Sequence, residues 1–368
     1  MKIQHSRLLI LLVSIGQLSG LVLAVAWFVS WLETSLINEL RSQVLLNDEF
    51  VMADQPEEII RSTVQHVVSV VYTIGISTAF VLAGFTILVT IAVVQRYENR
   101  LSQINSQLQR TNDRMTHDLA VAAEIQRSLL PKAPPEVAGV DFAWEHEPCD
   151  ELAGDILNVF LLDDDHIGLY VLDVSGHGVA ASLLSTTLNR ELSPAPVATS
   201  ILKRHVEGSR YQLLTPKEVA QQLNRNFPID QVTMQYFTLV YGILNLQTYE
   251  FRFVAAGHPP PVYLPRTAAP DILKTSGVLI GLTEDADFEE RSIQMHSGDR
   301  LVMYSDGITE TMNSVRKQFG TDGLIASLQQ THNSTLNDSI SSVLRSVANW
   351  RGNKRTEDDM TVLAIEIA

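Results

Sequence analysis

The chain has a single cysteine and few basic side chains. Among its 368 residues only Cys149 is a cysteine, which excludes an intrachain disulfide and a cysteine-rich zinc or iron–sulfur site. Lysine and arginine total 27 against 42 aspartates and glutamates, which gives a formal net charge of −15. Such an acidic chain repels phosphate backbones, and no basic stripe offsets this, so nucleic acid is not an expected partner. Any bound metal must therefore use oxygen or histidine ligands.

Charged residues are also missing from two long stretches near the N-terminus. Leu8 to Leu32 is a run of 25 uncharged residues, and a second run extends from Val67 to Val94. As a helix rising about 1.5 Å per residue, each run is long enough to cross a hydrocarbon core of about 30 Å. A cleaved signal peptide is the alternative for the first run, but its apolar region would be shorter, about 7 to 15 residues. We predict a membrane anchor over residues 1–95, with spans at 8–32 and 67–94 in contact with the lipid bilayer.

The distribution of charge predicts how this anchor is oriented. The segment between the two runs contains seven acidic residues but only Arg41 and Arg61 as strong bases. Basic residues lie instead before the first run, as Lys2 and Arg7, and after the second run, beginning at Arg96. Positively charged segments stay on the cytoplasmic side. Both termini, and the domain that follows the anchor, are therefore expected in the cytoplasm.

Residues 96–130 have the pattern of a signalling helix that leaves the membrane. Two series of mostly apolar residues recur every seven positions, Tyr97, Ile104, Thr111, Asp118, Ile125 and Leu101, Leu108, Met115, Ala122, Leu129. This pattern favours a parallel coiled-coil homodimer, and the prolines at 131, 134 and 135 end the helix. Thr111 and Asp118 weaken the seam, so an amphipathic helix packed on its own domain stays open as the alternative. A marginal coil of this kind is one that an input from the membrane can tighten or loosen.

Residues 131–368 are predicted to form one domain of the α+β class. Strand patterns occur at Ile167 to Asp173, Phe237 to Asn245, Tyr249 to Ala255, Arg300 to Tyr304 and Met360 to Ile367. Helical patterns occur at Val179 to Glu191, Pro216 to Asn226, Asp322 to Gln330 and Leu336 to Trp350. Ser193 to Thr215 has a less regular pattern and is expected to form a mobile flap. The acidic triplet at positions 163 to 165 is expected in a solvated hairpin turn.

Aspartates at the ends of strand-like runs are the candidate site residues. They are Asp155, Asp173, Asp306, and the adjacent pair Asp358 and Asp359. A carboxylate cluster without cysteine suits Mg²⁺ or Mn²⁺. Two such ions about 3.5 to 4 Å apart lower the pKa of a shared water and direct it at phosphorus. One Asp-Gly pair alone usually marks a turn, so it is the recurrence of the motif that matters.

The order of these motifs resembles a known family. The run Ala122 to Pro131 is followed by Ala153-Gly154-Asp155, Asp173 to Gly178, Ala256 to Pro260, Tyr304 to Glu310 and Asp358 to Val362. This order is similar to that of the SpoIIE-type branch of the metal-dependent PPM serine/threonine protein phosphatases, which includes bacterial sigma-factor regulators. The resemblance covers about residues 120–368. It implies an α-β-β-α sandwich with two metal ions, Mn²⁺ or Mg²⁺, at one end of its sheets. Together with the two uncharged runs, it predicts a location in the bacterial inner membrane.

The resemblance also implies roles for individual residues. Asp173 would bridge both metals, the carbonyl of Val174 would bind one, and Asp306 and Asp358 would complete the other. Asp155 would contact a metal or hold its water, and Asp359 is the second choice at its end of the site. The implied reaction is hydrolysis of phosphoserine or phosphothreonine by a metal-activated water, with Asp155, Asp173 and Asp306 as the catalytic residues. The implied partner is a phosphorylated regulatory protein, of the STAS type that antagonises anti-sigma factors.

Two departures from the family pattern bear on activity. The family's Gly-Gly-Asp is Ala153-Gly154-Asp155 here, and Asn158 stands where a second acid is usual, which predicts weaker activity or an altered metal preference. His177 lies two residues beyond the position of the histidine that acts as general acid in the eukaryotic branch, so it is not assigned that role. His258 is expected to be structural.

Two other function classes remain open. A catalytically impaired scaffold with this fold would bind phosphorylated signalling proteins without hydrolysing them, and Asn158 is its main support. A membrane-tethered nucleotide cyclase or phosphodiesterase is less favoured, since the chain has neither a Gly-Gly-Asp-Glu-Phe signature nor a His-Asp metal pair.

Overall fold

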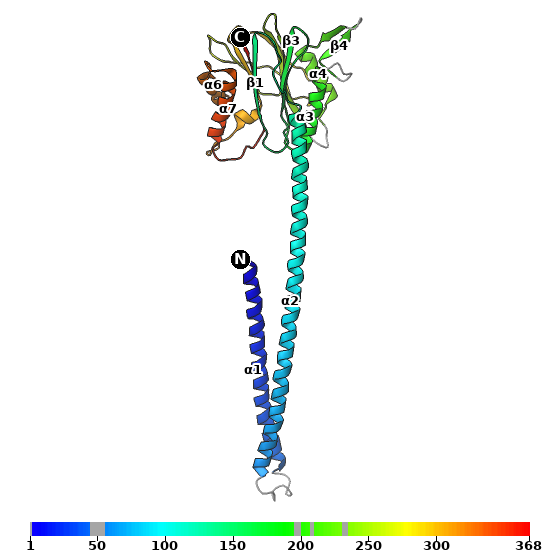
Figure 1. Cartoon of the computed structure of the whole chain (residues 1–368), viewed down its shortest axis with the longest axis vertical. Helices are drawn as coiled ribbons and strands as arrows, with labels where there is room; N and C mark the ends of the chain where they lie inside the picture. The colour runs from blue at the N-terminus through cyan, green and yellow to red at the C-terminus, as the bar shows by residue number, and fades with distance from the viewer. Residues whose placement is uncertain (1, 45–55, 195–199, 207–209, 230–234) are drawn as a thin grey trace. The chain divides into compact units, whose positions relative to one another are not determined.

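The computed structural model describes residues 2–44, 56–194, 200–206, 210–229 and 235–368, and Figure 1 labels its elements. It divides into two compact units, Met1–Asn112 and Asp113–Ala368. The division falls inside the predicted signalling helix at residues 96–130. The predicted bounds 1–95, 96–130 and 131–368 therefore stay a prediction.

The first unit contains α1 (Lys2–Val44) and the N-terminal part of α2 (Pro56–Arg127). A Cβ on Gly75 of α2 would lie 2.9 Å from Cγ1 of Val25 of α1, so the two helices approach closely there. Ser19–Gln43 and Glu57–Arg127 are each long and apolar enough to cross a membrane. Large apolar side chains such as Trp27 and Phe85 are exposed along them. This is the surface that a lipid-facing helix presents.

The second unit is built on two five-stranded sheets in which neighbouring strands pair in antiparallel fashion. One sheet has the order β1 (Val140–Glu147), β12 (Met360–Ile367), β11 (Arg300–Tyr304), β8 (Val262–Leu264), β9 (Asp271–Ile272). The other has the order β10 (Glu290–Gln294), β7 (Glu250–Ala256), β6 (Phe237–Asn245), β3 (His166–Val174), β2 (Ile156–Leu161). Short turns join neighbours such as β2 and β3, which is the connectivity that antiparallel hairpins allow.

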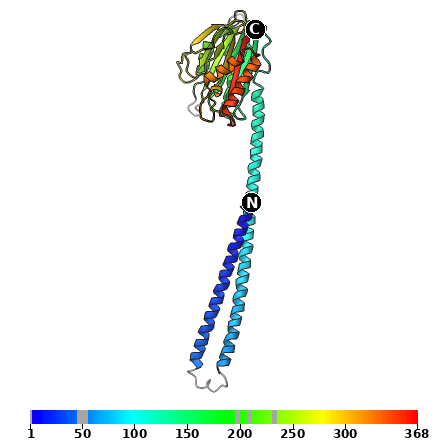
Figure 2. The same ribbon diagram turned by 90° about the vertical axis from the view of Figure 1, so that its left-hand side faces the viewer.

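Helices cover the outer face of each sheet. The helices α3 (Val179–Glu191) and α4 (Pro216–Asn226) pack on the β2–β3–β6–β7 side. On the other side are α5 (Asp306–Glu310), α6 (Gly320–Gln330) and α7 (Leu336–Arg351), with α7 against β1 and β12. Figure 1 shows the two helical layers on opposite sides of the strands, and in Figure 2 α7 lies in front of them. The expected α-β-β-α sandwich is confirmed.

Three apolar layers fill this sandwich. Between the sheets, Val171 and Phe253 belong to one cluster with Met303 and Leu363. A second cluster lies under α3 and α4, and a third lies under α6 and α7. The run Ile167 to Leu172 of β3 is buried on both faces, which explains its continuous apolar sequence.

The sequence interpretation was wrong in one segment. Residues 193–215 were expected to be irregular, but β4 (Lys203–Val206) and β5 (Arg210–Leu213) form an antiparallel hairpin within them. Residues 195–199 and 207–209 of that segment lie outside the described residues. The alternation of polar and apolar residues in β4 and β5 is short, which hides the strand pattern.

Candidate metal centre

The candidate aspartates meet at one end of both sheets. Asp155 directly precedes β2, and Asp173 is the next-to-last residue of β3, so the pairing of Ile156 with Leu172 brings the two side by side. In the other sheet, Asp306 follows β11, and the pair Asp358 and Asp359 precedes β12. Because β11 and β12 are antiparallel, the end of one and the start of the other share an edge.

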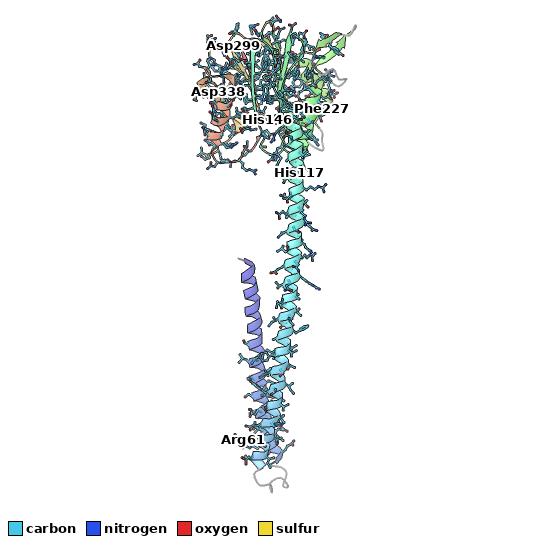
Figure 3. The ribbon with its side chains drawn as sticks, in the orientation of Figure 1. Arg61, His117, His146, Phe227, Asp299 and Asp338 are labelled. Carbon is cyan, nitrogen blue, oxygen red and sulfur yellow. The ribbon has the colours of Figure 1, made fainter. Side chains whose placement is uncertain are left out.

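Two labelled residues in Figure 3 mark the ends of the domain. His146 of β1 pairs with Thr361 of β12, so it lies at the end that carries the aspartates. Asp299 precedes β11 and lies at the opposite end. The acidic triplet at 163–165 forms the β2–β3 turn, also away from the site, as expected for a hairpin turn.

Asp155 is buried, and it interacts with the partly buried Asp173. Burial, together with the neighbouring Asp173 carboxylate, raises the pKa of Asp155 well above its usual range, against hydrogen bonds with Thr361 and Ser305. Burial, with repulsion from Asp306 and Asp358, raises the pKa of Asp173 to about 7, while a hydrogen bond with Asp155 opposes the rise. Within the described part of the chain, Oδ2 of Asp155 is buried and has no hydrogen-bond partner. Adjacent carboxylates with an orphaned oxygen are an arrangement that a divalent cation relieves.

Asp306 and Asp358 supply carboxylates from the second sheet. Burial raises the pKa of Asp306, and the nearby Glu310 carboxylate adds to the rise. Burial also raises the pKa of Asp358, with further repulsion from Asp306 and Asp359 and partial relief from His177. Each of these aspartates is therefore repelled by the negative charge of a neighbouring carboxylate, which again favours a bound cation.

Asp359 has a different environment from Asp358. Its Oδ1 accepts the backbone N–H of Cys149 at 2.7 Å, and its Oδ2 accepts those of Gly154 at 2.7 Å and Asp155 at 3.3 Å. The side chain is buried and ties the segment from 149 to 155 to the start of β12. These hydrogen bonds occupy both of its oxygens.

Two glycines allow the backbone to close around the aspartates. A Cβ on Gly154 would lie 2.6 Å from the carbonyl oxygen of Val174, so only glycine permits the Asp155 loop to approach that carbonyl. A Cβ on Gly307 would lie 2.0 Å from the carbonyl oxygen of Asp359. Gly154 thus lets the Asp155 loop lie against the Val174 carbonyl, and Gly307 lets the start of α5 lie against the Asp359 carbonyl.

Several supporting residues were missed in the sequence analysis. Ser305 and Thr361 interact with Asp155, and the Thr361 N–H donates to Oγ of Ser305 at 3.0 Å. Nδ1 of His146 is 2.9 Å from Oγ1 of Thr361, and burial lowers the pKa of His146. Ser305 and Thr361 stand inside the Tyr-Ser-Asp-Gly and Asp-Asp-Met-Thr motifs, which offered a signal. His146 stands in a strand without such a motif.

Gln126, in the last turn of α2, is a further residue that sequence reasoning missed. Its Nε2 donates to the carbonyl of Ala153 at 2.7 Å, and its Oε1 accepts the Ala153 N–H at 3.1 Å. Nε2 also lies 3.3 Å from Oγ of Ser185 on α3. The buried amide therefore joins α2 to the loop that carries Asp155. Its place in the motif Ala122 to Pro131 was the available signal.

The three remaining polar candidates have defined positions. Nδ1 of His177 lies 2.6 Å from Oδ2 of Asp150, and both side chains are exposed. His258 is buried, with Nδ1 2.7 Å from Oγ1 of Thr238, and burial lowers its pKa to about 3, which fits the structural role expected for it. Nδ2 of Asn158 lies 3.4 Å from Oδ1 of Asn189 on α3.

The thiol of Cys149 lies close to the site, and its surroundings favour the protonated form. Its Sγ can approach Asp358 and Asp359 within 4.8 Å, as one of three potential ligands. Burial, aided by the charge of Asp359, raises the pKa of the Cys149 thiol to about 12. A protonated thiol is neither a nucleophile nor a ligand for a hard cation, so the carboxylates determine the chemistry.

Comparison with known proteins identifies the family. The profile of the Stage II sporulation protein E (SpoIIE) family matches residues 163–368. The chain belongs to the SpoIIE family. Three of the four aspartate motifs lie inside the matched residues, whereas Asp155 and Gln126 lie before them.

Individual relatives of this SpoIIE-family chain are distant. It is 25% identical over 194 residues to phosphoserine phosphatase RsbU of Bacillus subtilis, covering 52% of this chain and 53% of the relative. It is 25% identical over 193 residues to phosphoserine phosphatase RsbP of the same organism, covering 52% and 45%. The chain thus spans about half the length of the curated relatives it matches.

Solved structures share the fold. The SiaA-PP2C domain of Pseudomonas aeruginosa matches with a TM-score of 0.57 at 19% identity, covering 70% of this chain and 99% of that domain. The RsbU and RsbW domains of Rv1364c from Mycobacterium tuberculosis match with a TM-score of 0.51 at 26% identity, covering 64% and 61%. The first likeness shows the fold alone, which is that of a PP2C-type domain.

Proposed function

We propose that this SpoIIE-family protein is a membrane-anchored protein serine/threonine phosphatase. The observation that carries the proposal is the convergence of Asp155, Asp173, Asp306 and Asp358 at one end of the two sheets. The names of two relatives, phosphoserine phosphatases RsbU and RsbP, support the same reaction class. The alternative is a PPM-fold scaffold that binds phosphorylated proteins without turnover.

The residues present fit two divalent cations, Mn²⁺ or Mg²⁺. The orphaned Oδ2 of Asp155 and the mutual repulsion of the aspartates are features that metal ligation would satisfy. Asp173 would hold both ions, the Val174 carbonyl would hold one of them, and Asp306 and Asp358 would hold the other. Asp155 lies beside Asp173 as a further ligand or as the holder of a ligand water. Asp359 completes the set mainly by fixing the 149–155 segment.

The reaction is hydrolysis of a phosphate monoester. An oxygen from water forms a bond to phosphorus, the bond from phosphorus to the serine or threonine oxygen breaks, and a proton ends on that oxygen. The products are the free hydroxyl side chain and inorganic phosphate. Bound metal ions would neutralise phosphate charge and lower the pKa of the attacking water. The contribution of this chain is to hold the carboxylates in place through Ser305, Thr361 and Asp359.

We propose a phosphorylated regulatory protein as substrate, of the STAS type that antagonises anti-sigma factors. The names of the RsbU and RsbP relatives, both phosphoserine phosphatases, support a phosphorylated protein as substrate, and the STAS type is what the family resemblance implies. We place the protein in the bacterial inner membrane as a multi-pass protein with its phosphatase domain in the cytoplasm. The two apolar helices and the basic residues that flank them support this orientation.

We further propose that a coiled-coil homodimer transmits the signal. Apolar side chains at the heptad positions, among them Leu101 and Leu108, are exposed along α2. The same helix ends in Gln126, whose amide holds the loop before Asp155. A change in coil geometry would thus reach the metal ligands through one buried side chain. Deletion of residues 1–96 should then change turnover or metal affinity, and unchanged kinetics would reject the coupling.

The function is tested on the full chain in lipid nanodiscs. Phosphate release from a phosphoserine peptide and from p-nitrophenyl phosphate is measured with Mn²⁺ and with Mg²⁺. We expect turnover that Asp173→Asn and Asp306→Asn each reduce by at least about a hundredfold, because each removes a ligand. Asp164→Asn is the matched control, since Asp164 lies exposed in the β2–β3 turn. Metal binding without turnover in the unaltered chain would reject the enzyme and favour the scaffold.

A further inference from the structure

A pocket of about 210 Å³ opens beside the candidate metal centre. Gly307 and Asp358 line it on the side of the proposed ligands. The rest of its wall includes Arg351, the last residue of α7, and Lys354 and Arg355 from the link that leads to β12. The pocket and the centre therefore share Asp358, so a ligand that fills the pocket would be a neighbour of whatever the aspartates bind.

The three cationic side chains retain unused hydrogen-bonding capacity. Nζ of Lys354 donates to the carbonyl of Asn313 at 2.9 Å, which leaves two of its protons available. Nη1 of Arg351 donates to Oγ1 of Thr356, while its buried Nε has no partner in the described part of the chain. Arg355 is exposed, and none of the hydrogen bonds or ion pairs found among the described residues involves it.

This concentration of positive charge is unusual for the chain. Three of its 27 basic residues stand within five positions, 351–355, although the net charge is −15. Glu310 and Glu357 also line the pocket, as does Asp358. When the charge of Asp358 is matched by a bound cation, as the proposed function requires, three positive side chains face two negative ones. The pocket then favours an anion.

The pocket wall is held in place by the segment that follows α5. Lys354 contacts Asn313 in that segment, and Nε1 of Trp350 donates to the carbonyl of Lys317 at 3.0 Å. The Trp350 ring also packs edge-on against Phe319, with 6.0 Å between ring centroids. The cations therefore project from an ordered support, which lowers the entropic cost of binding.

We propose that this pocket binds an acidic side chain of the protein substrate next to its phosphorylated serine or threonine. The inference rests on the proposed function, because it places the phosphate at the aspartates and the flanking carboxylate at Arg355. Guanidinium groups match the planar geometry of a carboxylate and can bind both of its oxygens. The pocket thus selects substrates with an acidic residue beside the phosphorylated one, and it discriminates chiefly through KM.

The test compares two phosphoserine peptides on the full chain in nanodiscs. One peptide carries Asp or Glu on either side of the phosphoserine, and the other carries Asn or Gln at the same positions. We expect kcat/KM to favour the acidic peptide about fivefold at low salt, as a few partly exposed ion pairs allow. Arg355→Ala should bring the ratio close to one, and added NaCl should do the same because it screens the charges.

The matched control is Arg345→Ala. Arg345 is an exposed cation on α7, and it is not among the residues that line the pocket. This variant removes the same charge and should keep the ratio of the unaltered chain. A ratio of one in the unaltered chain, or an equal ratio in Arg355→Ala, would overturn the proposal even though both peptides are hydrolysed.

A separate readout distinguishes this failure from failure of the proposed function. If neither peptide is hydrolysed, the phosphatase assignment fails, and binding of the fluorescent acidic peptide is measured by anisotropy with Mn²⁺ present. Salt-sensitive binding that Arg355→Ala weakens and Arg345→Ala does not would support the pocket. Equal affinity for the two peptides would overturn it.

Discussion

The side-chain amide of Gln126 forms hydrogen bonds with both the N–H and the carbonyl of Ala153. Donor and acceptor lie 2.7 and 3.1 Å apart in these two bonds, and the side chain is buried. Ala153 is two residues before Asp155, so the last turn of α2 is tied directly to the loop that carries a proposed metal ligand. The end of one helix and the start of the metal site form one hydrogen-bonded unit.

Gln126→Ala should weaken metal activation. The substitution leaves both backbone groups of Ala153 without their partner in a buried site, at a cost of about 1 to 3 kcal/mol each. We expect the Mn²⁺ concentration for half-maximal turnover to rise about tenfold. Gln107→Ala is the control, because Gln107 is exposed on the same helix. A loss of thermal stability with unchanged Mn²⁺ dependence would show that Gln126 is only structural.

The metal-free domain should lose stability as the pH rises through about 7. Burial raises the pKa of Asp173 to about 7 in the folded chain, above the value of about 3.9 in an unfolded one. The folded state therefore binds more protons, and this stabilisation is present at low pH and lost as the pH rises through 7. In EDTA, the thermal midpoint should decrease as the pH is raised from about 5 to about 7.5, and it should decrease less in Asp173→Asn.

Metal should reverse this trend, because a cation competes with the proton for the same carboxylates. With Mn²⁺ present, the midpoint should rise from pH 6.5 to 8 in the unaltered chain. Calorimetry of the unaltered chain and Asp173→Asn, with and without Mn²⁺, measures both slopes. The same pH slope in EDTA for the two proteins would mean that Asp173 is not the titrating group.

Alanine substitution should affect metal-free stability at Asp359 and metal binding at Asp358. Asp359→Ala removes the acceptor of three backbone N–H groups, from Cys149, Gly154 and Asp155. We expect the metal-free thermal midpoint to fall by at least about 6 °C, since each of the three buried donors left unpaired costs about 1 to 3 kcal/mol. Asp358→Ala removes a carboxylate that repels Asp306, so it should leave the metal-free midpoint nearly unchanged and abolish metal binding. Isothermal titration with Mn²⁺ and thermal melts in EDTA separate the two effects.

Much of the fold was predictable because its central elements have strong periodicity. The expected strand at Phe237 to Asn245 and the expected helices at Val179 to Glu191 and Pro216 to Asn226 match β6, α3 and α4. Their apolar runs and cap residues, such as the Thr215 capping box with Glu218, are local signals. The strand β1 was not expected, although apolar residues alternate in it with charged ones such as Glu145 and Glu147.

The site was less accessible to sequence reasoning than the fold. The aspartates were expected from motifs, since Asp-Gly pairs at strand ends are local features. The hydrogen bonds that distinguish Asp359 from Asp358 join residues more than 200 positions apart, so no local pattern reports them. The contact of Gln126 with Ala153 also depends on tertiary packing across 27 positions.

Asn158→Asp should not raise activity, although an acid is usual at this position in the family. The amide of Asn158 faces Asn189 at 3.4 Å, and the Tyr170 hydroxyl donates to the same Asn189 oxygen. An aspartate there would place a second acceptor against that oxygen in a partly buried site. We expect a loss of about 1 kcal/mol, or a thermal midpoint lower by about 2 to 4 °C, with unchanged kcat. An increase in kcat above twofold would show that the position acts on the metal centre.

The apolar seam of α2 should be covered by the same helix of a second chain. The side chains of Leu108 and Met115 are 67% and 60% exposed. They stand seven residues apart, at the same position of two successive heptads. In a parallel dimer each residue meets its own copy, so single cysteines at 108 or 115 should form disulfide-linked dimers in membranes when Cys149 is replaced by serine. A cysteine at position 107, outside both heptad series, should cross-link several times less. Equal cross-linking at 107 and 108 would indicate random collision, and absence of cross-links at both seam positions would favour a helix that packs on its own domain.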